Sequence, residues 1–173
     1  QHVRLHIVFM LPLAGSWLAA LDPEFAGPLA YLSSIRGAAY VNQWGDDWQA
    51  GLAASYDLAS QAVALHERSP HAHYALGTIQ FWNREFDCAM ASQKRAIALD
   101  PNLAVAHTMI GLVHHYSGDS TAALKPFQTT LRLDPLGGDV VVHQIGLCHF
   151  MLGDYAAAET AFKDRISQSP STD

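Results

Sequence analysis

The stretch Ile110–Pro135, IGLVHHYSGDSTAALKPFQTTLRLDP, contains the pattern that decides the fold. Within it, Gly111 precedes Ala123 by 12 positions, and Ala123 precedes Pro135 by a further 12. The same spacing occurs twice more, with a period of 34 to 35 residues. The other two sets are Gly77, Ala89 and Pro101, and Gly146, Ala158 and Pro170. A period of this length predicts a supersecondary unit that stacks on its neighbours.

The residues between these markers predict two antiparallel helices in each repeat. A glycine in one helix and an alanine in the next remove bulk where two helices cross closely, so we expect Gly111 to cross beside Ala123. Gly118-Asp119 and Gly153-Asp154 favour a helix stop followed by an N-cap. The expected helices are 24–41, 48–67, 71–83, 86–99, 104–117, 120–133, 139–152 and 155–168.

This pattern resembles the tetratricopeptide repeat (TPR) family. The matching residues are Tyr74-Ala75-Leu76-Gly77, Ala89, Ala96 and Pro101, then Gly111, Gly118, Ala123, Phe127 and Pro135, then Gly146, Gly153, Tyr155, Ala158, Phe162 and Pro170. His73 and His107 stand where Trp is usual, and Gln93 replaces the late aromatic residue of the first copy. The resemblance implies an all-α, right-handed solenoid of antiparallel helix hairpins.

We expect one TPR array over residues 1–173. It divides into a partial leading helix at 1–22, an irregular repeat with an elongated turn at 23–69, and clear repeats at 70–103, 104–138 and 139–170. The insert at 42–48 and the Leu-Asp-Pro turns look like the C-terminal TPR regions of bacterial class III adenylate cyclases and winged-helix transcriptional regulators. That narrower likeness implies the regulatory part of a larger bacterial signalling protein.

The composition favours a globular protein, because half of the 173 residues are apolar. A formal charge of −6 argues against a nucleic-acid partner. The apolar stretch at 5–21 is short and interrupted by Pro12, so no membrane partner is expected and the predicted location is cytoplasmic. A secretory signal is the alternative for this segment, because Arg4 precedes an apolar run that ends in small residues at Ala19 and Ala20. Cys88 and Cys148 stand apart without a metal-ligand spacing, which favours buried, reduced thiols.

Ten histidines raise the alternative of a metal site, for which His71, His115 and His143 are the candidates. Zinc needs three or four converging ligands, and no carboxylate or cysteine joins these three in the pattern. We therefore expect no metal, no cofactor and no catalytic residue, and hence no enzyme. Asp46 or Asp47 is interpreted as a helix N-cap rather than as part of a calcium loop.

The resemblance places the second, fifth, ninth and twelfth positions of each first helix on a concave groove. With two neighbouring residues, the expected partner-binding positions are His71, Tyr74, Thr78, Phe81, Trp82, Thr108, Leu112, His115, His143, Leu147, Phe150 and Met151. An aromatic, apolar groove favours a module that binds a protein, as a peptide or helix. The alternative is that neighbouring helices cover some of these residues.

Self-assembly is a second candidate function. Only Ser171-Thr172-Asp173 follow Pro170, and the N-terminal segment is rich in Ile7, Val8 and Phe9, so both ends of the array would expose apolar surface. The expectation that follows is a homodimer or a longer stack, formed through an end or through the groove.

Overall fold

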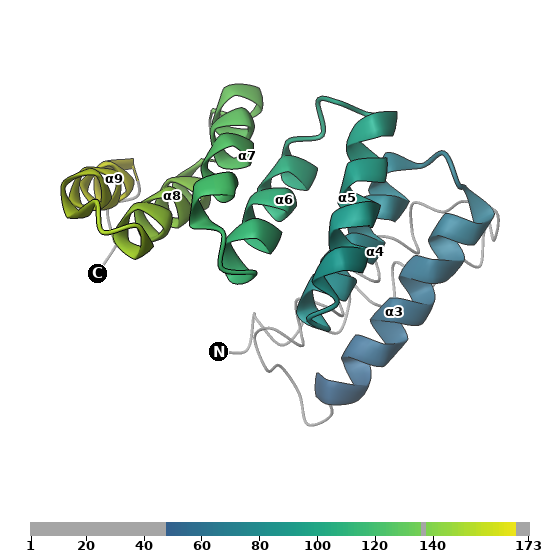
Figure 1. Cartoon of the computed structure of the whole chain (residues 1–173). Helices are drawn as coiled ribbons and strands as arrows, with labels where there is room; N and C mark the ends of the chain where they lie inside the picture. The colour runs from purple at the N-terminus through teal and green to yellow at the C-terminus, as the bar shows by residue number, and fades with distance from the viewer. Residues whose placement is uncertain (1–47, 136–137, 169–173) are drawn as a thin grey trace, which may run out of the picture. The chain divides into compact units, whose positions relative to one another are not determined.

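The computed structural model describes residues 48–135 and 138–168, and every regular element in these ranges is an α-helix (Figure 1). The helices are α3 (Trp48–Leu65), α4 (Pro70–Trp82), α5 (Phe86–Leu99), α6 (Ala104–Tyr116), α7 (Ser120–Leu133), α8 (Asp139–Met151) and α9 (Tyr155–Gln168). The all-α prediction is confirmed, and each of these helices begins and ends within two residues of its expected bounds. The helix expected at 24–41 and the caps at Asp46 and Asp47 lie outside the described residues.

The chain divides into two compact units, Gln1–Asp100 and Pro101–Asp173. In the first unit, α4 packs against both α3 and α5. In the second, α6 pairs with α7 and α8 pairs with α9, and α8 also contacts both α6 and α7. The single array over 1–173 and its repeat boundaries stay a prediction.

Each hairpin turns through one residue in the left-handed region. Gly118 has φ of 91° and Gly153 has φ of 79°, and the equivalent position of the first clear repeat is Arg84 with φ of 63°. Glycine adopts this conformation without a steric penalty, whereas a residue with a Cβ is strained there. The turn therefore keeps the same backbone path even where the sequence departs from glycine.

Aspartate side chains start the second helices of the two later hairpins, as the sequence predicted. The carboxylate of Asp119 accepts a hydrogen bond of 2.9 Å from the Ala122 backbone N–H, and Asp154 accepts one of 3.1 Å from Ala157. Each bond satisfies one of the amide groups that a helix start leaves without an intrahelical partner.

The histidines that stand in place of Trp tie the inter-repeat turns to the first helices. His73 Nε2 lies 2.8 Å from the carbonyl oxygen of Glu67, and His107 Nε2 lies 3.0 Å from that of Pro101. A carbonyl oxygen can only accept, so Nε2 carries the proton and donates in both cases. Each bond joins two residues that are six positions apart. Histidine in place of Trp therefore still links the turn to the helix that follows it.

The repeated glycines face the second helix of their own hairpin, where the nearest side chain is larger than the expected alanine. A Cβ on Gly111 would lie 2.5 Å from Phe127 Cε1, and a Cβ on Gly146 would lie 2.5 Å from Phe162 Cε1. The expected neighbour Ala123 precedes Phe127 by four residues, which is about one helical turn. The nearest contact at the crossing is therefore glycine under an aromatic ring, on the same face of α7 as Ala123, and the crossing of Gly111 beside Ala123 stays a prediction.

Candidate partner-binding surface

The fifth position of each first helix contacts the second helix of the same hairpin. Gln93 Nε2 donates to the Tyr74 carbonyl at 3.1 Å, the Thr108 and Thr130 hydroxyl oxygens lie 3.1 Å apart, and the His143 and Phe162 ring centroids are 5.5 Å apart. All three fifth-position side chains are half-buried. Burial raises the pKa of the Tyr74 phenol, against a smaller opposite effect of its hydrogen bond with Thr78.

The twelfth position lies at the junction between the two helices of a hairpin. In each repeat it contacts the residue five positions later, which begins the second helix. These contacts join the rings of Phe81 and Phe86 with centroids 5.8 Å apart, His115 Nδ1 and Ser120 Oγ at 3.0 Å, and the rings of Phe150 and Tyr155 with centroids 5.6 Å apart. Phe81 is only 4% exposed, so the expectation that its ring lines an open groove is wrong.

His115 is half-buried and contacts the next hairpin. Cys148 Sγ of α8 lies 3.4 Å from His115 Nδ1, the same nitrogen that faces the Ser120 hydroxyl. Burial lowers the pKa of the His115 imidazole from its ordinary value of 6.5 and raises that of the Cys148 thiol to about 11. Both groups are therefore neutral near pH 7. A protonated thiol is a poor nucleophile, so this pair is a packing contact rather than an activated Cys–His pair.

Across 48–135 and 138–168, no group of three or more His, Cys, Asp and Glu side chains is placed to hold a metal ion. None of the helices in the same ranges is both long and apolar enough to span a bilayer.

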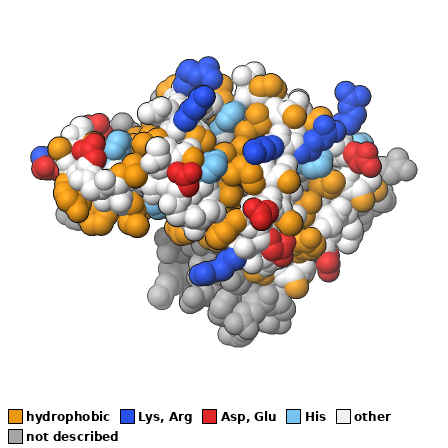
Figure 2. Space-filling model, in the orientation of Figure 1, with side chains coloured by type: hydrophobic (Ala, Val, Ile, Leu, Met, Phe, Trp, Pro, Cys, Tyr) orange, Lys and Arg blue, Asp and Glu red, His pale blue; other side chains and the backbone are white. Residues whose placement is uncertain are grey.

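Exposed apolar side chains gather where α8 turns into α9. Phe150, Met151, Leu152 and Tyr155 are all exposed, and the rings of Phe150 and Tyr155 meet edge to face. Figure 2 shows hydrophobic side chains over this hairpin in the second unit. Interfaces concentrate their binding energy on such aromatic anchors, and monomeric surfaces seldom expose several together.

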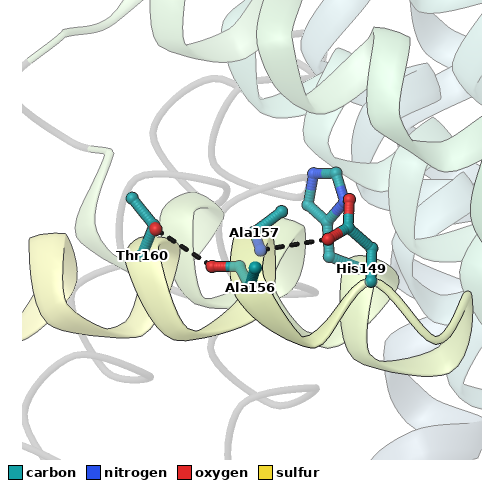
Figure 3. A network of polar contacts seen from close by, with 5 residues as sticks. His149, Ala156, Ala157 and Thr160 are labelled. Atoms are coloured by element: carbon teal, nitrogen blue, oxygen red, sulfur yellow. Dashed lines mark hydrogen bonds and ion pairs between the residues drawn. The ribbon is translucent and has the colours of Figure 1, made fainter.

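Polar contacts hold the same turn in place. His149 Nδ1 lies 3.6 Å from the Asp154 carboxylate, which also caps α9, and the Thr160 hydroxyl donates to the Ala156 carbonyl at 3.0 Å. Figure 3 shows His149 beside the first turn of α9, next to these bonds. The apolar side chains are thus presented by a capped, hydrogen-bonded turn.

The expected partner-binding residues fall into three classes of exposure. His71, Phe150 and Met151 are exposed; Tyr74, Thr78, Trp82, Thr108, Leu112, His115, His143 and Leu147 are half-buried; and Phe81 is buried. Those up to Trp82 belong to the first unit and the rest to the second. Their role in binding a partner stays a prediction.

Sequence reasoning missed Tyr155 and Ile166 as surface residues. Both are exposed large side chains on α9. The repeat period could have drawn attention to both residues through their counterparts in the preceding repeat. Ile166 stands 35 residues after Leu131, which is half-buried beside the core, and Tyr155 stands 35 residues after Ser120, which is buried.

Comparison with known proteins defines the class of fold. No family model matches the sequence, and no curated protein does either. Among solved structures, TPR proteins superpose on the chain, so the predicted TPR fold is confirmed.

Three solved structures illustrate the match. MamA is 24% identical with a TM-score of 0.68, over 91% of this chain and 86% of its own. TTC0263, a thermophilic TPR protein from Thermus thermophilus, is 22% identical with a TM-score of 0.68, over 91% of this chain and 76% of its own. YrrB, a TPR protein with an unusual peptide-binding site, is 16% identical with a TM-score of 0.64, over 98% of this chain and 82% of its own.

Proposed function

We propose that this chain is a protein-interaction module that binds a peptide or helix through the groove side of its first helices. The observation that carries the proposal is the exposed aromatic and apolar cluster at Phe150 and Met151, on a fold shared with a peptide-binding TPR protein. The net charge of −6 favours a protein partner over a nucleic acid. The context is the regulatory part of a larger bacterial signalling protein in the cytoplasm.

Enzymatic activity and metal binding are the weaker alternatives. The one Cys–His contact described, between Cys148 and His115, holds a thiol whose pKa is raised to about 11, which disfavours nucleophilic chemistry near pH 7. Metal analysis of the purified protein tests the second alternative directly. Stoichiometric zinc retained after dialysis would contradict the proposal that the module acts through protein contacts alone.

Selection from a displayed peptide library, followed by calorimetric titration of a selected peptide, tests the groove. Val140→Ser and Met151→Ser remove exposed apolar side chains from groove positions of α8, and we expect each to weaken binding about tenfold. Gln128→Ser, at an exposed position of α7, is the matched control and is expected to bind like wild type. Equal affinity in all four proteins, or no enriched peptide, would contradict the proposal.

A further inference from the structure

The surface on which α8 packs is repeated one period later, on the α8–α9 hairpin. We call this second surface the end face, made of Phe150, Tyr155, Glu159, Phe162 and Ile166. Each member stands 35 residues after its counterpart in the α6–α7 hairpin. The counterparts are His115, Ser120, Leu124, Phe127 and Leu131.

The two surfaces differ in burial. With α8 seated, Ser120 is 6% exposed, whereas Tyr155 on the end face is 65% exposed. Ile166 is 67% exposed, while its counterpart Leu131 packs against the core of the second unit. Met151 is not counted in the end face, because its counterpart Tyr116 is exposed although a hairpin follows it. The end face is therefore exposed because no described helix covers it as α8 covers the first surface, and not because hairpin tips are exposed in general.

The helix that fills the first surface shows what would fill the second. On α8, Val141 and Cys148 are buried against Ala123 and Phe127, with Ile145 packed beside them. Val141, Ile145 and Cys148 are spaced i, i+4 and i+7, which is one apolar stripe of an amphipathic helix. Tyr155 and Phe150 are bulkier than Ser120 and His115, so the third residue of an equivalent stripe must be small.

The end face also has a polar element. Glu159 replaces Leu124 and is paired with Lys163 at 2.6 Å, and this pair lowers the pKa of the Glu159 carboxyl. Covering charged groups without compensation is costly. A helix that docks here needs a polar group opposite Glu159, next to its apolar stripe.

A second copy of this chain has no stripe of this kind to offer in the parts described. In α4, α6 and α8 the first and third residues of the equivalent stripe are buried, and the middle one is half-buried. These residues are Ala72, Leu76 and Ile79; Ala106, Ile110 and Val113; and Val141, Ile145 and Cys148. We propose that the end face binds an amphipathic helix of a partner protein, with Val or Ile at positions i and i+4 and a small residue at i+7, in the way that α8 packs on α7.

Fluorescence anisotropy with a labelled synthetic peptide tests this proposal on the whole chain. The peptide has the sequence of residues 139–151 with Cys148→Ala, and the control peptide also carries Ile145→Pro, which breaks the helix. Saturable binding of the first peptide alone is expected. Tyr155→Ser and Ile166→Ser in the protein should each weaken it about tenfold or more, because each removes an apolar contact.

Leu65→Ser is the matched control variant, because Leu65 is an exposed apolar side chain of α3 that belongs neither to the end face nor to the groove positions. Val140→Ser, at a groove position of α8, shows whether the peptide binds in the groove. No saturable binding, or a loss in Val140→Ser in place of Ile166→Ser, would overturn the proposal; the latter result would place the peptide in the groove. Light scattering tests whether a second copy of this chain occupies the end face instead. A wild-type dimer that Ile166→Ser converts to a monomer would show that a second copy covers the face, and would equally overturn the partner helix.

Discussion

The two cysteines provide a residue-scale test of packing. Cys148 of α8 is fully buried against the α6–α7 hairpin, and burial raises its thiol pKa to about 11. Cys88 is exposed on α5, so the expectation that both thiols are buried is wrong for Cys88. In disulfide exchange the thiolate attacks a sulfur of the reagent's disulfide, so a thiol reacts only when it is ionised and accessible. We expect Ellman's reagent to titrate one thiol rapidly in native protein and the second only on unfolding. Cys88→Ser should abolish the rapid phase; a rapid phase that persists would contradict the burial of Cys148.

His115 should make stability depend on pH. Because burial lowers its pKa in the folded chain, the unfolded chain binds the proton more readily between that value and 6.5. The stability contributed by neutral His115 is therefore present above pH 6.5 and is lost as pH falls towards the folded pKa. Urea unfolding at pH 7.5 and 5.5 measures this loss. His115→Asn keeps a polar atom towards Ser120 without titrating, so its loss should be smaller than that of wild type.

The position of His115 differs from the one that the sequence predicted. A residue in an open groove would tolerate truncation, but this imidazole contacts both Ser120 and Cys148. The sequence could not reveal this, because the three residues meet only when α8 packs on the α6–α7 hairpin. Helix bounds, by contrast, follow from local signals such as the capping Asp119 and the left-handed Gly118, and these were predictable.

At the scale of the helix pair, Gly111→Ala should destabilise the protein by up to about 2 kcal/mol. The new Cβ meets the fully buried Phe127 ring at 2.5 Å, and overpacking costs roughly 1–3 kcal/mol, against a gain of about 1 kcal/mol in helix propensity. Gly146→Ala is the matched comparison, because its neighbour Phe162 is only half-buried and its ring has room to shift. Urea unfolding should give a smaller loss for Gly146→Ala; equal losses would contradict this account.

At the left-handed residues of the hairpin turns, adding a Cβ should lower the stability of the protein and removing one should raise it. Gly118→Ala places a Cβ on a residue with φ of 91°, and we expect the protein to lose about 1 kcal/mol of stability. Backbone strain is the cause, because the new Cβ would have no neighbour within 4 Å with which to clash. Arg84→Gly relieves the same strain at φ of 63° and should stabilise by less than about 1 kcal/mol, because glycine gains entropy when unfolded. Thermal melts of both variants check the signs, and destabilisation by Arg84→Gly would contradict the strain.

For the whole molecule, the division at Asp100 and Pro101 has a spectroscopic consequence. All four tryptophans, Trp17, Trp44, Trp48 and Trp82, belong to the first unit, whereas the helices of both units contribute to far-ultraviolet circular dichroism. In repeat proteins, stability is approximately the sum of local terms and nearest-neighbour coupling. Gly111→Ala, in the second unit, should therefore lower the urea midpoint of the dichroism transition while leaving that of tryptophan fluorescence nearly unchanged. Equal shifts in both signals would show instead that the two units unfold as one cooperative structure.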